Sequence, residues 1–165
     1  MSIPNSFSPM GTLRMMKELP YVQPIMTSAT TWSNEPSFGM TVTGEGQVSG
    51  NEPWRIFAAN GAWWADGWNG QAFLNFTQPL KITRIVLGCD EKLSTRTMYG
   101  DFFAEINGQW VKLGSYSYVL TSTAGGEDVI EISSPVYATR YRISLYCESG
   151  YGRMTYANLT AMYKQ

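Results

Sequence analysis

The chain of 165 residues contains no histidine. Histidine is the commonest general base in enzymes and the commonest protein ligand of transition metals. The two cysteines, Cys89 and Cys147, lie far apart in the sequence and form no CxxC pattern. A zinc site and a cysteine nucleophile with an activating base are therefore excluded. We expect each cysteine to fill a small apolar space within a strand and not to form a disulfide.

Charge is also scarce. Charged residues make up 15% of the chain, and 12 basic against 13 acidic residues give a net charge of −1. Without a basic field to attract phosphates, a nucleic-acid partner is not expected. No segment approaches the roughly 20 apolar residues that cross a bilayer, and no secretory signal is recognisable. We therefore expect a protein that does not insert into membranes and is made in a cytoplasm.

Catalytic motifs are missing as well. A glycosidase needs two carboxylates facing each other across a cleft. The acidic pairs Asp90–Glu91 and Glu127–Asp128 are neighbours in expected turns, where solvation explains them. There is no GxSxG elbow and no phosphate-binding loop. The sequence thus predicts a protein that is not an enzyme and that uses no cofactor and no metal.

Residues 1–25 differ in character from the rest of the chain. Pro4, Pro9, Pro20 and Pro24 interrupt the segment, and it has too few apolar residues for a core of its own. Either it is a solvated leader or it is an arm that docks on a partner. We favour a non-globular docking arm over residues 1–25, followed by one domain over residues 26–165. The side chains expected to contact the partner are Phe7, Met10, Leu13, Met15, Met16 and Leu19.

The signals after residue 25 are almost all those of β-strands. Residues 73–76 alternate apolar and polar side chains, and residues 82–88 form a β-branched run. The Asn107–Gly108 pair suits a type I′ hairpin turn. Tyr141, Ile143 and Leu145 share one face of a predicted strand, opposite Arg140 and Arg142, which we expect to lie across a sheet face. About eight short strands without a helix predict an all-β fold, an antiparallel β-sandwich or jelly roll.

Four of the six tryptophans lie within residues 53–70. We expect Trp54, Trp68 and, further along, Trp110 to pack against the sandwich. Trp63 and Trp64 are adjacent, and adjacent side chains of an extended chain point in opposite directions. At least one of them should therefore face outward as a flat apolar platform, on which a sugar ring can stack.

Polar and aromatic neighbours complete the predicted ligand site. Arg96 and Arg153 could read sugar hydroxyls or could be ordinary surface groups, and Tyr151 could equally be a rim residue that covers the sandwich end. The candidate ligand-binding residues are Trp63, Trp64, Asp66, Asn69, Arg96, Tyr151 and Arg153.

The order of these motifs resembles that of discoidin-like domains, also called coagulation factor V/VIII C-type or galactose-binding-like domains. The matching positions are Trp54, Phe57, Trp68, residues 79–85, 107–110 and 140–143, and Tyr163. The resemblance implies an eight-stranded jelly roll whose loops at one end often hold a sugar. It also implies, in some relatives, a structural calcium in the turn after Phe57. Relatives commonly carry Asp-Gly there, whereas this chain has Ala58–Gly61, so a bound calcium is not expected.

A proline- and methionine-rich arm ahead of such a domain looks like the accessory modules of phage tail fibres and baseplates. This resemblance implies a virion protein that is made in the host cytoplasm and binds other virion proteins through residues 1–25. The module would form a homo-oligomer and bind host-surface carbohydrate through its aromatic loop. The alternative is a purely structural adaptor or decoration protein whose aromatic loop packs against another protein, because tyrosine, tryptophan and methionine are also enriched in protein interfaces.

Overall fold

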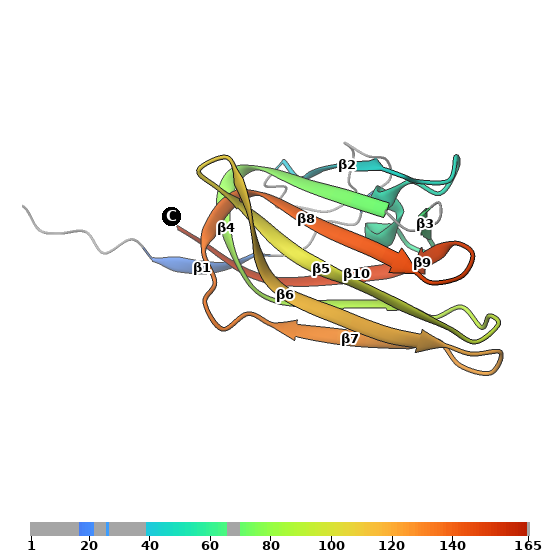
Figure 1. Ribbon diagram of the computed structural model, residues 1–165. Coiled ribbons are helices and arrows are strands. Elements are labelled where there is room, and N and C mark those ends of the chain that lie inside the picture. The colour runs from blue at the N-terminus through green and yellow to red at the C-terminus, as the bar shows by residue number, and fades with distance from the viewer. Residues whose placement is uncertain (1–16, 22–25, 27–38, 66–69, 165) are drawn as a thin grey trace, which may run out of the picture.

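A computed structural model describes residues 17–21, 26, 39–65 and 70–164. Apart from one short 3₁₀ helix, the regular structure of these residues consists of β-strands (Figure 1). In chain order the elements are β1 Glu18–Tyr21, β2 Thr41–Glu45, the 3₁₀ helix η1 Pro53–Phe57, β3 Trp63–Ala65, β4 Gly70–Cys89, β5 Arg96–Ile106, β6 Gln109–Leu120, β7 Gly126–Glu131, β8 Tyr137–Cys147, β9 Gly152–Met154 and β10 Tyr156–Lys164.

Strand β4 belongs to both layers of the sandwich. Its first part, residues 70–75, pairs antiparallel with β2 and β8. Its second part pairs antiparallel with β10 and β7. One layer therefore has the order β2–β4–β8–β5–β6 and the other β1–β10–β4–β7 (Figure 1). The predicted all-β antiparallel sandwich is confirmed, but the strands expected at residues 73–76 and 82–88 are two parts of one strand, with the exposed Pro79 between them.

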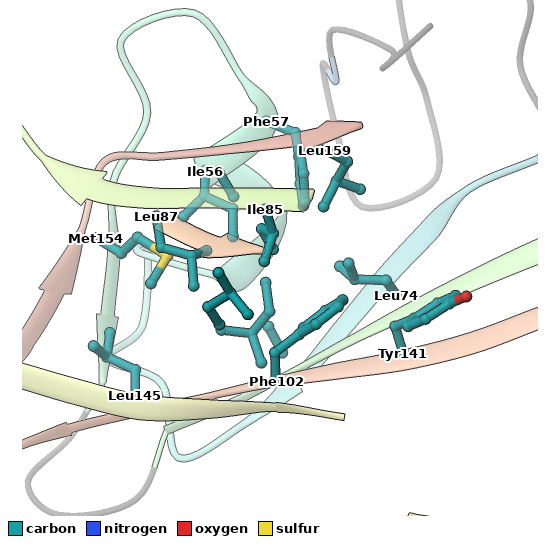
Figure 2. Packing of buried hydrophobic residues seen from close by; sticks show 14 of the residues in the cluster. Ile56, Phe57, Leu74, Ile85, Leu87, Phe102, Tyr141, Leu145, Met154 and Leu159 are labelled. Atoms are coloured by element: carbon teal, nitrogen blue, oxygen red, sulfur yellow. The ribbon is translucent and has the colours of Figure 1, made fainter. Parts of the chain in front are cut away.

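The core lies between the two layers and is built from the alternate residues of each strand. Figure 2 shows side chains of β4, β5 and β8 meeting those of β10 and η1. Tyr141, Ile143 and Leu145 are fully buried, as predicted, and the Tyr141 ring stacks on Phe102 with a centroid distance of 5.5 Å. The two cysteines are free and buried in β4 and β8, which confirms that they fill apolar space.

The last residues of the predicted arm are part of the sheet. Strand β1 pairs with β10 from Glu18↔Lys164 to Tyr21↔Ala161, so the sheet begins ahead of the expected boundary at residue 25. Leu19 is half-buried within this pairing. The physical reason is that an extended segment covers the open edge of β10, whose backbone groups would otherwise be unpaired. The other docking candidates lie outside the described residues: Phe7, Met10, Leu13, Met15 and Met16.

Local chemistry explains the turn between β5 and β6 and the 3₁₀ helix. Asn107 and Gly108 have φ values of 51° and 78°, which confirms the type I′ turn. Residues 53–57 form η1, with Pro53 at its first turn. No helix among the described residues has the length and apolar character needed to cross a membrane.

Trp54 and Trp110 have different surroundings. Trp54 is half-buried against the core, as expected. The prediction that Trp110 packs into the sandwich is wrong. It lies opposite Glu105 on the outer face of β6, with its ring 5.8 Å from that of Phe73. Outward and inward positions alternate along a strand, and Trp110 occupies an outward position of β6. Trp68 lies outside the described residues.

Candidate functional site

The short β3–β9 ribbon lies at the end of the sandwich where β8 and β9 are joined by the exposed residues 148–151 (Figure 1). Trp64 pairs with Arg153 across this ribbon. On the other edge of β3, the Trp64 N–H donates to the Asn51 carbonyl at 3.1 Å, and the Val48 N–H donates to the Trp64 carbonyl at 2.8 Å. Together with the pairing to Arg153, these two hydrogen bonds hold the backbone of Trp64 on both edges of β3.

The two adjacent tryptophans point in opposite directions, as the strand geometry requires. Trp63 is fully buried in the core. Its inclusion among the ligand-binding residues is therefore wrong, because no ligand can reach its ring in the folded protein. Trp64 lies on the other side of the ribbon and is half-buried.

Trp64 forms a cluster with Tyr151 and Arg153. The rings of Trp64 and Tyr151 are stacked at a centroid distance of 6.4 Å and an interplanar angle of 28°. The Arg153 Cζ lies 3.6 Å from the Trp64 ring centroid, and the guanidinium forms an ion pair with Glu91. Trp64 is therefore covered by its neighbours, whereas the side chain of Tyr151 is 48% exposed. Tyr151 is the more exposed of the two rings.

Arg96 lies beside the same loop. Its Nη2 donates to Ser94 Oγ at 2.6 Å, and a Cβ atom added to Gly150 would lie 3.1 Å from its Nη1. Gly150 has a φ of 75°, which glycine adopts without strain. The structure thus brings Arg96, Tyr151, Trp64 and Arg153 to one end of the sandwich. The remaining two candidates, Asp66 and Asn69, lie outside the described residues.

A cavity of about 350 Å³ adjoins this cluster. Its lining includes Asn60, Asp90, Glu91 and Tyr156, and Glu91 is also the ion-pair partner of Arg153. Sequence reasoning treated Asp90 and Glu91 as solvated turn residues and did not connect them to the site. The contact joins residues far apart in the chain, so no local pattern could have indicated it.

The side chains of the turn after Phe57 offer few oxygen ligands to a calcium ion. Calcium takes six to eight oxygen ligands, mostly from carboxylates and carbonyls. Ala58 and Ala59 carry no side-chain oxygen, and Asn60 is exposed with a φ of 59°. Within the described ranges, no group of three or more histidine, cysteine, aspartate or glutamate side chains is arranged to hold a metal.

No protein-family model and no curated protein matches the chain. Solved structures do. A family 32 carbohydrate-binding module from C. perfringens NanJ, in complex with galactose, matches with a TM-score of 0.56 and 14% identity, over 73% of this chain and 93% of that one. A pectin-binding carbohydrate-binding module matches with a TM-score of 0.55 and 16% identity, over 72% of this chain and 88% of that one.

A third similar structure is the family 32 module of AlyQ in complex with 4,5-unsaturated mannuronic acid. It matches with a TM-score of 0.55 and 16% identity, over 74% of this chain and 93% of that one. At these identities the likeness concerns the fold. The chain shares the β-sandwich fold of these carbohydrate-binding modules, in agreement with the β-sandwich that its sequence predicts.

Proposed function

We propose that this protein is a non-catalytic carbohydrate-binding module whose ligand stacks on Tyr151. The observation that carries the proposal is the exposure of this ring on a surface loop. Tyr151 is 48% exposed and rests on Trp64, which is itself fixed by Arg153 and by backbone hydrogen bonds. A rigid aromatic ring offers a flat apolar surface to the C–H face of a sugar at little entropic cost.

Polar groups beside the ring would orient the sugar. Arg96 has donors at the edge of the Tyr151 loop, and its hydrogen bonds go to Ser94, not to a carboxylate. The adjoining cavity contributes the side chains of Asn60, Asp90 and Glu91, which can accept hydrogen bonds from hydroxyl groups. The fold neighbours that hold galactose and 4,5-unsaturated mannuronic acid support the ligand class.

The second part of the proposal concerns the biological setting of the module. The arm-like composition of residues 1–25 supports attachment of the module to a phage tail fibre or baseplate, as a homo-oligomer that presents Tyr151 to host-surface glycans. The alternative is a structural adaptor whose Tyr151 loop packs against another virion protein. The adaptor requires no affinity for sugar, so a binding experiment separates the two.

The test is calorimetric titration of the protein with neutral oligosaccharides that contain galactose, fucose or glucose. At least one should bind, and Tyr151→Ala should weaken its binding about tenfold, which corresponds to about 1.4 kcal/mol. Tyr151→Phe is the matched control, because it keeps the ring and should retain most of the affinity. The proposal fails if no neutral glycan binds, or if Tyr151→Ala binds as well as the unmodified protein.

A further inference from the structure

A second cluster of aromatic and basic side chains lies on the outer face of the layer β2–β4–β8–β5–β6. The strand register puts five residues in one row across the layer: Thr43, Phe73, Arg142, Phe103 and Lys112. Beside it, Asn75 pairs with Arg140 and Glu105 pairs with Trp110, and an ion pair between Arg140 and Glu105 joins these two pairs. None of these residues belongs to the Tyr151 site, which lies at the end of the sandwich.

Arg142 occupies the centre of this face. Its Cζ lies 4.0 Å from the ring centroid of Phe103 and 4.9 Å from that of Trp110. Its Nε is buried and has no hydrogen-bond acceptor among the described residues. The two rings therefore hold the guanidinium in place through cation–π contacts but satisfy none of its donors.

Arg142 differs in this respect from the other arginines of the described chain. Four of them pair with a carboxylate, and one donates to a serine: Arg55 with Glu52, Arg84 with Glu131, Arg140 with Glu105, Arg153 with Glu91, and Arg96 with Ser94. Arg142 alone has neither a hydrogen bond nor an ion pair within the described residues. A half-buried arginine without an acceptor is costly to maintain, so it points to an acceptor that a ligand supplies.

The charges around Arg142 cancel one another. Arg140 is paired with Glu105 at 2.7 Å, and Lys112 with Asp101 at 3.2 Å. The guanidinium of Arg142 is thus the one cation of this cluster that has no carboxylate partner among the described residues. Its planar set of donors matches the geometry of a carboxylate.

We propose that this face is a second carbohydrate-binding site, which takes a carboxylate-bearing polysaccharide. The carboxylate would bind Arg142, and the sugar rings would lie against Trp110 and Phe73. The polar residues Thr43 and Asn75, which pair with Phe73 and Arg140, suit hydroxyl groups.

The surroundings favour this ligand over a macromolecular partner. Trp110, Phe73 and Phe103 are all half-buried, so they do not form the broad apolar centre that a protein interface of about 800 Å² per partner requires. A net charge of −1 disfavours nucleic acid.

The experiment uses two probes with the same backbone: polygalacturonate, and its fully methyl-esterified and therefore uncharged form. The unmodified protein should bind polygalacturonate at least tenfold more tightly than the ester by calorimetry. Arg142→Gln should abolish this preference. Arg84→Gln removes an exposed arginine from the other layer and is the matched control, which should leave the preference unchanged. Tyr151→Ala should also leave it unchanged, so failure here is distinct from failure at the Tyr151 site.

A spectroscopic readout keeps the test independent of the folding of the variant. In the unmodified protein, the ¹⁵N–¹H signal of Arg142 Nε should shift on addition of trigalacturonate, whereas that of Arg84 should not. The proposal is overturned if polygalacturonate and its ester bind equally, if Arg142→Gln retains the preference, or if the Arg142 signal does not move. The proposal is also overturned if poly-glutamate binds as tightly as polygalacturonate and this binding depends on Arg142, because the site would then select charge and not sugar.

Discussion

Removal of the Tyr141 hydroxyl group tests the account of how the two layers are joined. This hydroxyl lies in the core, 2.7 Å from the carbonyl oxygen of Leu80, to which it donates, and 3.0 Å from that of Val136. Leu80 stands where β4 passes from one layer to the other, and Val136 precedes β8. Tyr141→Phe removes one oxygen atom at this junction and keeps the ring in its place.

The expected loss of unfolding free energy follows from the contacts that the variant keeps and from the hydrogen bond that it loses. The ring contacts with Phe102 at 5.5 Å and Phe76 at 6.1 Å are retained, so no large cavity forms. The Leu80 carbonyl, however, loses the hydroxyl donor in a region that water does not reach. An unsatisfied buried group of this kind costs about 1–3 kcal/mol. For a chain of this length, each kcal/mol lowers the melting temperature by about 2–4 °C, so we expect a decrease of about 2–12 °C.

Urea unfolding with linear extrapolation measures the free energy directly. The control is Tyr146→Phe, on the outward side of the same strand, whose hydroxyl has no hydrogen bond within the described residues and whose ring lies 5.7 Å from that of Tyr99. It should change the free energy of unfolding by less than about 0.5 kcal/mol. If Tyr141→Phe also changes the free energy of unfolding by less than about 0.5 kcal/mol, the hydroxyl does not link the layers and the prediction is refuted.

Two further predictions concern packing and pH. Gly100→Ala should lower the free energy of unfolding by about 1–3 kcal/mol or more, because its Cβ would lie 1.9 Å from the Ser144 carbonyl oxygen; an unchanged urea midpoint would contradict this contact. Burial raises the pKa of Tyr141 to about 12, and burial together with the Glu18 hydrogen bond raises that of Tyr137 to about 12, both from 10.0. As the pH rises, the two hydroxyls lose their protons in the unfolded state before they do so in the folded state. The stability that the protonated hydroxyls contribute below pH 10 should therefore be lost as the pH rises from 10 to 12. Urea unfolding at a series of pH values measures this loss. Tyr141→Phe should flatten this dependence, and an identical dependence in the variant would exclude Tyr141 as a contributor.

Local patterns in the sequence correctly predicted the parts of the fold that depend on neighbouring residues. The Asn107–Gly108 turn follows from the positive φ that both positions adopt, and the buried face of β8 follows from simple alternation. The same alternation separated Trp63 from Trp64 without indicating which of them was buried. The length of β4 was missed because residues 73–76 and 82–88 show two different strand patterns, although a strand can bend at a proline such as Pro79 and continue in the other layer.

The sequence by itself determined the fold class, the hairpin turn and the inward residues of the strands, because backbone conformation and side-chain alternation act over a few residues. It also pointed to residues 53–70 and to Tyr151 as candidates for an exposed aromatic surface. Only the tertiary structure decided that Tyr151 is exposed and Trp63 buried, that Glu91 pairs with Arg153, and that Arg142 Nε has no hydrogen-bond acceptor among the described residues. These outcomes depend on strands that are far apart in the chain and adjacent in space, and on the acceptors that their packing provides or withholds.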